Sequence, residues 1–149
     1  MAEDAAVILS QYDSKARTLG QIWNYIRSGI LRSERAVDIQ HYSIAPGQDE
    51  SNCIRFQLFG APCYVAFSHD LTCGCLEYGV LDPLSPEDRP RRIVVARMQL
   101  DDGGRLEGGI APQDVSSVIR AHLGLVASKA PQLLSAFAEA HHGARESRS

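Results

Sequence analysis

The 149-residue sequence lacks the short motifs that identify many enzymes: it has no GxSxG nucleophile elbow, no HExxH helix and no phosphate-binding P-loop. No apolar run reaches the roughly 20 residues that a membrane-spanning helix requires. The start, MAEDAA, is acidic and lacks the basic region of a signal peptide. The formal net charge of −3 gives no basic footprint for nucleic acid. From these absences we expect a cytoplasmic protein with no membrane partner and no general affinity for nucleic acid.

The composition, with 44% hydrophobic and 22% charged residues, is that of an ordinary globular protein. A chain of this length can bury a core of its own, and the sequence shows neither an internal repeat nor a domain boundary. We expect a single domain over residues 1–142 and a disordered tail over residues 143–149.

The segment 53–80 predicts three antiparallel strands. Apolar and polar residues alternate between Ile54 and Leu58, as in a strand with one buried face. Residues 60–62, Gly-Ala-Pro, predict a tight turn, and Asp-Leu at 70–71 predicts a second one. We expect the remaining strands and helices to fold onto this hairpin pair.

The expected register places Val65 opposite Phe56 or Leu58 in the preceding strand and opposite Leu76 in the following strand. These registers give the same two faces, because side chains alternate along a strand. One face is expected to be buried and consists of Ile54, Phe56, Leu58, Cys63, Val65, Phe67, Leu76, Tyr78 and Val80. The other face consists of Arg55, Gln57, Tyr64, Ala66, Ser68, Cys73, Cys75 and Glu77.

Two flanking segments predict amphipathic helices. The first covers residues 4–31, and its stripe either covers the sheet or forms a seam for a partner helix. The second follows Pro112, has Asp114 in its first turn and is expected to bend or restart at Pro131. The first stripe consists of Ile8, Tyr12, Ala16, Leu19, Trp23, Ile26 and Ile30.

Two more strands complete the expected fold. Ala36–Ile44 is one, with ambiguous facing, and another begins at Ile93 and is expected to bury Val94, Ala96, Met98 and Leu100. Between the central strands and the strand that begins at Ile93, the prolines of 82–90 exclude a helix and predict an exposed hairpin loop. The predicted fold class is α+β: a long N-terminal helix, an antiparallel meander of about five strands and a bent C-terminal helix, with both helices on one face of the sheet.

A cluster of thiols and imidazole is the obvious hypothesis for a metal site. Cys63, His69, Cys73 and Cys75 are the right residue types for zinc, but they lack paired CxxC spacing. The register also places Cys63 and His69 on one face and both other cysteines on the opposite face. We therefore expect reduced thiols without a metal or a cofactor, and no catalytic residue. His122 lies on an apolar helical stripe and is expected to be a satisfied core or interface histidine.

The polar sheet face is the most suggestive feature, because Tyr and Arg are the residue types that anchor protein interfaces. It is either a solvated face with cross-strand ion pairs or a platform for a partner. The basic end of the proline loop, Arg89, Arg91 and Arg92, is a weaker second candidate. The predicted partner-binding residues are Arg55, Gln57, Tyr64, Glu77, Arg97 and Gln99.

The predicted function is therefore non-enzymatic binding of another protein, of the inhibitor, immunity or chaperone/adaptor type, with a homodimer as one possible state. The helix–meander–helix outline is similar in shape to small bacterial adaptor, immunity and secretion-chaperone proteins. Secretion chaperones of this size usually interrupt their sheet with a helix, which the proline loop excludes, and shape alone does not imply function. The alternative is a thiol- or zinc-dependent protein or small enzyme that uses Cys73, Cys75 and a histidine.

Overall fold

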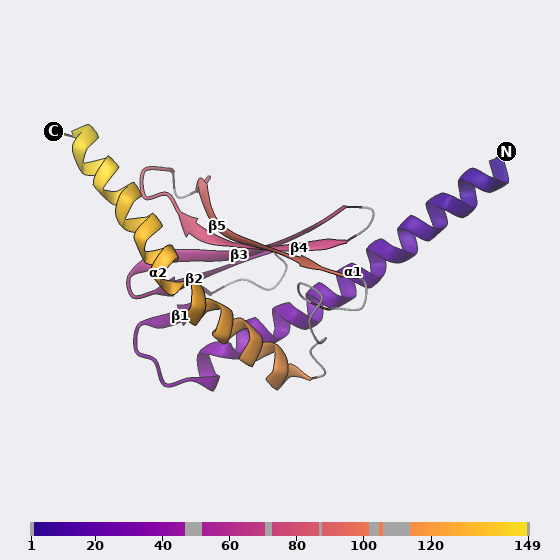
Figure 1. Ribbon diagram of the computed structural model, residues 1–149, viewed down its shortest axis with the longest axis horizontal. Helices are drawn as coiled ribbons and strands as arrows, with labels where there is room; N and C mark the ends of the chain where they lie inside the picture. The colour runs from indigo at the N-terminus through magenta and orange to yellow at the C-terminus, as the bar shows by residue number, and fades with distance from the viewer. Residues whose placement is uncertain are drawn as a thin grey trace.

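The computed structural model describes residues 2–46, 52–70, 73–86, 88–101, 105 and 114–148. It confirms the predicted α+β class: an N-terminal helix, a five-stranded antiparallel sheet in the order β1-β2-β3-β4-β5, and a C-terminal helix (Figure 1). The elements are α1 (Ala2–Ala36), β1 (Tyr42–Ile44), β2 (Cys53–Leu58), β3 (Ala61–His69), β4 (Gly74–Leu81), β5 (Arg92–Leu100) and α2 (Val115–Arg148). No helix among the described residues is long and apolar enough to cross a membrane.

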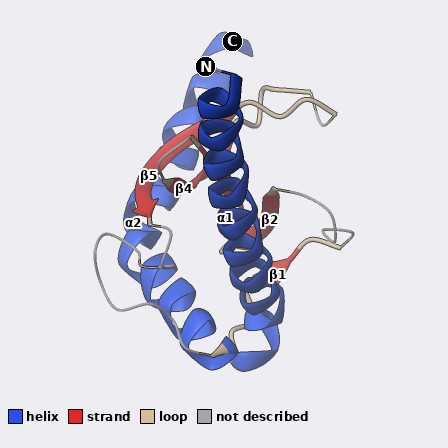
Figure 2. Ribbon diagram, turned by 90° about the vertical axis from the view of Figure 1, so that its right-hand side faces the viewer, coloured by secondary structure: helices blue, strands red, loops and turns tan. Residues whose placement is uncertain are grey.

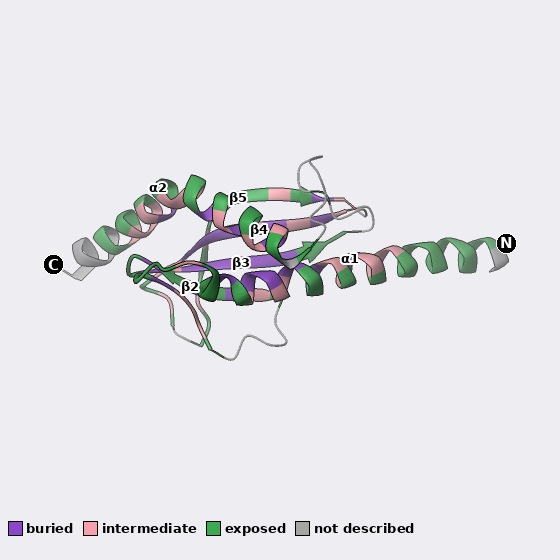
Figure 3. Ribbon diagram, turned by 90° about the horizontal axis from the view of Figure 1, so that it is seen from below, coloured by how far each residue is buried: buried purple, intermediate pink, exposed green. Residues whose placement is uncertain are grey.

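Both helices pack on the same face of the sheet, which we call the inner face. Figure 3 looks at the molecule from below and shows α1 and α2 in front of the strands. The helices also contact each other, and Figure 2 shows α2 beside α1. A Cβ added at Gly29 of α1 would lie 2.4 Å from Val118 Cγ1 of α2, so this glycine permits their close approach. The buried inner-face residues include all those predicted for it: Ile54, Phe56, Leu58, Cys63, Val65, Phe67, Leu76, Tyr78 and Val80.

In the first central hairpin the strand register differs by two residues from one of the expected registers and by four from the other, and in the second hairpin it differs by two. Val65 lies opposite Ile54 of β2 and Tyr78 of β4. The first turn is formed by Phe59 and Gly60, whose φ angles of 50° and 86° are both positive, as in the two-residue turns that match the twist of a hairpin. The predicted Gly-Ala-Pro turn is therefore wrong, because residues 61–62 already pair in β3. A shift by an even number of residues leaves the side chains of β2, β3 and β4 on their predicted faces.

The edge strands show two further differences. Strand β1 is shorter than the predicted 36–44, and its buried Tyr42 settles the ambiguous facing in favour of Tyr42 and Ile44. In β5, a bulge shifts the register between Tyr78 and Gly79 of β4. Val94 consequently leaves the core side and is 41% exposed, whereas Ile93 packs against the core. The prediction was right for Ala96, Met98 and Leu100.

The helices are longer than predicted. Helix α1 ends at Ala36 rather than at residue 31, and α2 continues through Pro131 as one helix that changes direction part-way along (Figure 1). The carboxylate of Asp114 caps the start of α2: hydrogen bonds from the Ser117 side chain and, at 2.7 Å, from the Ser117 amide hold the pKa of Asp114 below its usual value. Because α2 extends to Arg148, the division into a domain at 1–142 and a tail at 143–149 stays a prediction.

Candidate functional site

The sheet face opposite the helices, here called the open face, contains all the predicted partner-binding residues. The register pairs Arg55 with Tyr64, and Glu77 with Arg97. These pairs come from strands that are adjacent in the sheet, so the face is continuous from β2 to β5. The exposed members are Arg55, Gln57, Arg97 and Gln99, whereas Glu77 is half-buried.

Tyr64 differs from the prediction, because its side chain is fully buried (0% exposed) although it lies on the open face. The ring rests on the backbone of Gly79, where an added Cβ would lie 2.9 Å from Tyr64 Cε1 and from its Oη. The guanidinium of Arg92 lies over the ring, 5.2 Å from its centroid. Tyr64 is therefore covered by its neighbours rather than projecting from the sheet.

Glu77 fixes both the tyrosine and the neighbouring arginine. One carboxylate oxygen accepts a 2.7 Å hydrogen bond from Tyr64 Oη, and the other accepts one of 3.1 Å from Arg97 Nε. Burial raises the pKa of Tyr64, and Glu77 raises it further, so the hydroxyl remains a donor at all physiological pH values. The result is a rigid polar network in the middle of the face.

The charge of the open face is opposite in sign to the net charge of the chain. Arg55, Arg92 and Arg97 lie on it, and Glu77 is its one acidic residue within the described strands. The whole chain has a formal net charge of −3. Segregated charge of this kind steers and orients partners of the opposite sign.

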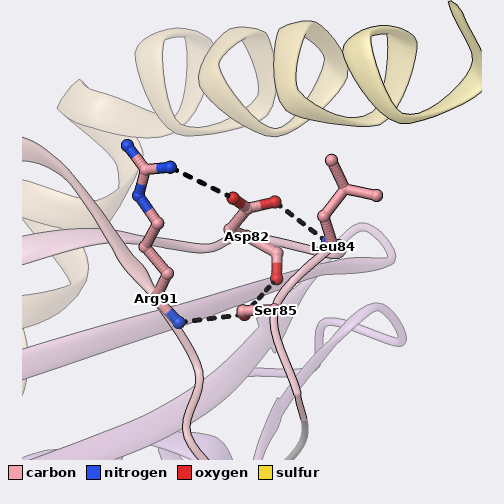
Figure 4. A network of polar contacts seen from close by, with 4 residues as sticks. All are labelled: Asp82, Leu84, Ser85 and Arg91. Carbon is pink, nitrogen blue, oxygen red and sulfur yellow. Dashed lines mark hydrogen bonds and ion pairs between the residues drawn. The ribbon is translucent and has the colours of Figure 1, made fainter. Parts of the chain in front are cut away.

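The β4–β5 loop borders this face and forms a cleft of about 480 Å³ with it, lined by Arg55, Pro62, Leu81, Asp82, Pro83, Ser85, Pro86 and Pro90. The loop is held by its own polar contacts (Figure 4). Asp82 accepts a hydrogen bond from the Leu84 amide at 2.9 Å, and Ser85 Oγ donates to the Asp82 carbonyl at 2.6 Å. The Arg91 amide donates to Ser85 Oγ at 2.9 Å. The predicted hairpin loop is therefore a structured rim of the open face.

A second hollow lies at the other side of the molecule, between the β2–β3 turn and α2. It has a volume of about 540 Å³, is almost wholly apolar, and is lined by Val37, Ile39, Tyr42, Leu58, Phe59, Arg120, Leu123, Gly124, Val126, Ala127 and Ala130. No predicted partner-binding residue lines it.

The buried polar cluster around His122 confirms the prediction of a satisfied core histidine. The ring is 4% exposed, with Nε2 2.9 Å from Tyr42 Oη and Nδ1 2.7 Å from Tyr78 Oη. Ser33 Oγ donates to the Ile30 carbonyl at 2.5 Å, so its hydroxyl must accept from Tyr42 Oη, 2.6 Å away. Tyr42 then has only its oxygen left for His122, which makes Nε2 the protonated nitrogen and Nδ1 the acceptor from Tyr78.

This chain of hydrogen bonds has one direction and satisfies each buried group in it. Burial lowers the pKa of His122 from 6.5 to about 3 and raises that of Tyr42 from 10.0 to about 12, so both groups stay neutral. The cluster joins α1, β1, β4 and α2. We interpret it as a device that fixes how these elements pack.

Cys63 and Cys75 lie on opposite faces of the sheet, as predicted, whereas Cys73 lies just before β4 begins. Cys63 is buried on the inner face, and burial raises its pKa to about 12, which makes it unreactive. Cys75 lies on the open face near Arg97 and Glu77, and burial raises its pKa too. Within the described ranges, no three His, Cys, Asp or Glu side chains lie close enough together to hold a metal ion.

Two contributors to these sites were missed or undervalued from the sequence. The sequence pattern predicts Arg92 at the basic end of the proline loop, yet its guanidinium lies over Tyr64 and joins the loop to the open face. Ser33 belongs to no predicted site; its signal is a polar residue three positions after Ile30, in line with the apolar stripe of α1. Neither contact is readable from spacing, because the partner residues are distant in sequence.

The comparisons with known proteins give no further constraint: no family model, no curated protein and no solved structure matches the chain. The geometry described above is therefore the basis for the functional argument.

Proposed function

We propose that the chain is a non-enzymatic protein-binding module whose open face binds an acidic surface of another protein. The observation that supports this most is the pair of exposed arginines, Arg55 and Arg97, on a face whose buried Tyr64 and half-buried Glu77 are held by hydrogen bonds. A rigid, arginine-rich surface loses little conformational entropy on binding, and arginine is among the residues that dominate interface energetics.

The structured β4–β5 loop adds a cleft to this positively charged surface. Its internal hydrogen bonds around Asp82 and Ser85 hold the cleft open beside Arg55 before any partner arrives. A partner segment with a carboxylate at this point can enter the cleft, and the apolar prolines of the loop can contact its backbone or aliphatic side chains. Inhibitors, immunity proteins and adaptors act by this kind of surface occupation.

The test is reversal of charge on the open face. The partner is first captured from the native cytoplasm with the wild-type chain and identified by mass spectrometry, and its affinity is then measured by calorimetry. Arg55→Glu with Arg97→Glu is expected to weaken binding by at least about a hundredfold, or 2.7 kcal/mol, because charged pairs in an interface become repulsive. Added salt should weaken the wild-type complex.

The matched control is Arg32→Glu with Arg35→Glu, which makes the same change of charge at exposed positions of α1. It should bind as the wild type does. Unchanged affinity of the Arg55 and Arg97 variant would exclude the open face as the partner-binding surface. Cys73→Ser with Cys75→Ser should also bind normally; loss of function in that variant would favour the alternative thiol- or zinc-dependent protein.

A further inference from the structure

The first part of α1 extends beyond the sheet without covering anything. Figures 1 and 3 show the N-terminal end of the helix projecting away from the strands. The stripe is buried from Leu19 onward, through Trp23 and Ile26 to Ile30. Between Asp4 and Ser14, by contrast, every residue is exposed.

The projecting part nevertheless continues the same apolar stripe. Spacings of alternately four and three residues run from Ala5 through Leu9, Tyr12 and Ala16 to Leu19, the repeat of a helix seam that packs against another helix. Leu9 is 66% exposed, and Val7, Ile8 and Tyr12 are exposed beside it. Single exposed apolar residues are ordinary, but a contiguous group along one helix marks an interaction surface.

The sequence of this segment fits an antiparallel copy of itself. If the two segments cross between residues 10 and 11, Leu9 of one copy meets Tyr12 of the other, and Ala5 meets Ala16. Large residues then fill the centre and alanines let the helices approach at both ends. Such a contact is two-fold symmetric, and it closes as a dimer.

The charges favour the same arrangement. Asp4 lies near the start of the segment and Lys15 near its end, so an antiparallel pair with this crossing places Asp4 opposite Arg17 and within one helical turn of Lys15 of the other copy. A parallel pair would instead place Asp4 beside Asp4. Antiparallel packing also opposes the two helix dipoles. Asp13 forms an ion pair with Arg17 of its own helix at 2.6 Å, so its negative charge is compensated and does not repel the second copy.

We propose that the projecting segment of α1 is a self-association surface, which joins two copies of the chain through an antiparallel helix pair. The surface lies on α1 and leaves the open face free, so a dimer would present two open faces to its partners. The contact would also stabilise the helix itself, because helical segments of roughly 12–15 residues are marginal in water without a packing partner.

The experiment is sedimentation velocity of the full chain across a wide range of concentration, with Leu9→Glu and Gln11→Glu compared. Both substitutions add a negative charge to the same turn, but only Leu9 lies in the seam. The wild type and Gln11→Glu should sediment as dimers of the 16.3 kDa chain. Leu9→Glu should weaken the dimer at least about a hundredfold, and any loss of helical circular dichroism should be small and confined to the released segment, because Leu9 lies outside the core.

Charge exchange tests the direction of the helices. Asp4→Lys and Lys15→Glu should each weaken the dimer, and the double variant should restore it, because both cross-pairs are then reversed together. A monomeric wild type, a dimer that survives Leu9→Glu, or a double variant that is no better than the single ones would overturn the proposal. None of these results depends on partner binding, so the proposed function stands or falls separately.

Discussion

The neutral, enclosed His122 makes a quantitative prediction about stability and pH. Its pKa is lowered to about 3 in the folded protein because burial disfavours the imidazolium, whereas the unfolded chain has the ordinary value of 6.5. The folded state therefore binds fewer protons than the unfolded state between these values. The stability that comes from the neutral ring is complete above pH 6.5 and is lost as the pH falls toward 3.

The magnitude follows from the two pKa values. Each pH unit below 6.5 removes about 1.4 kcal/mol, so the loss is roughly 1.4 kcal/mol at pH 5.5 and roughly 2.7 kcal/mol at pH 4.5. Carboxylates also titrate in this range, and a reference variant is needed to separate them. His122→Gln is suitable, because its side-chain amide can donate and accept hydrogen bonds but does not titrate.

The assay is urea unfolding of the wild type and His122→Gln at a series of pH values between 7.5 and 4.5. The variant should be less stable at pH 7.5, because two buried tyrosine hydroxyls lose well-placed partners, at a cost of about 1–3 kcal/mol. The difference between the two proteins should then shrink by the amounts given above, since all other groups are shared.

A difference that stays constant across this range would refute the reasoning, because His122 would then titrate alike in both states. Nitrogen NMR of the wild type gives an independent check on the hydrogen-bond directions. It should find the proton on Nε2, facing Tyr42, with Nδ1 accepting from Tyr78; the opposite tautomer would contradict the order derived from Ser33.

Two further predictions concern the backbone. Gly79→Ala should destabilise the protein by about 2–3 kcal/mol in urea unfolding, because the new Cβ would lie 2.1 Å from the Ile93 carbonyl and 2.9 Å from the Tyr64 ring. Gly20→Ala is the control, because nothing lies within 4 Å of a Cβ added there, and it should stabilise the helix by about 0.5–1 kcal/mol. Equal effects of the two substitutions on stability would show that a Cβ at Gly79 can be accommodated. Phe59→Asn should stabilise the protein by about 0.5–1 kcal/mol, because Phe59 has a φ of 50° that asparagine tolerates better in a two-residue hairpin turn. A loss of stability there would mean that the aromatic contacts of Phe59 outweigh the strain.

The sequence determined which face of each central strand is buried. The observed register differs from the expected ones by two or four residues in the first hairpin and by two in the second, yet Val65, Phe56 and Leu76 all lie on the inner face as predicted. The predicted faces are still correct because side chains alternate with a period of two. A shift by an even number of residues therefore changes the cross-strand partners of a residue but not its face. For the same reason, the six predicted partner-binding residues do share the open face.

The sequence also determined the helical stripes and the position of the proline loop, since both depend on local residue pattern. It was wrong about the first turn and about Val94. Those features depend on how the strands twist against each other: positive φ at Phe59 and the bulge in β5 serve the pairing of whole strands, which no local signal encodes.

Only the tertiary structure decided which polar residues meet. Tyr42 and Tyr78 contact His122 across 80 and 44 residues of sequence, and Arg92 closes over Tyr64 because the β4–β5 loop returns the chain to the same face. The sequence likewise shows one continuous stripe on α1, but its burial stops near Leu19 because the sheet ends there. Periodicity assigns a side chain to a face; whether that face is covered depends on the length and position of the element that packs against it.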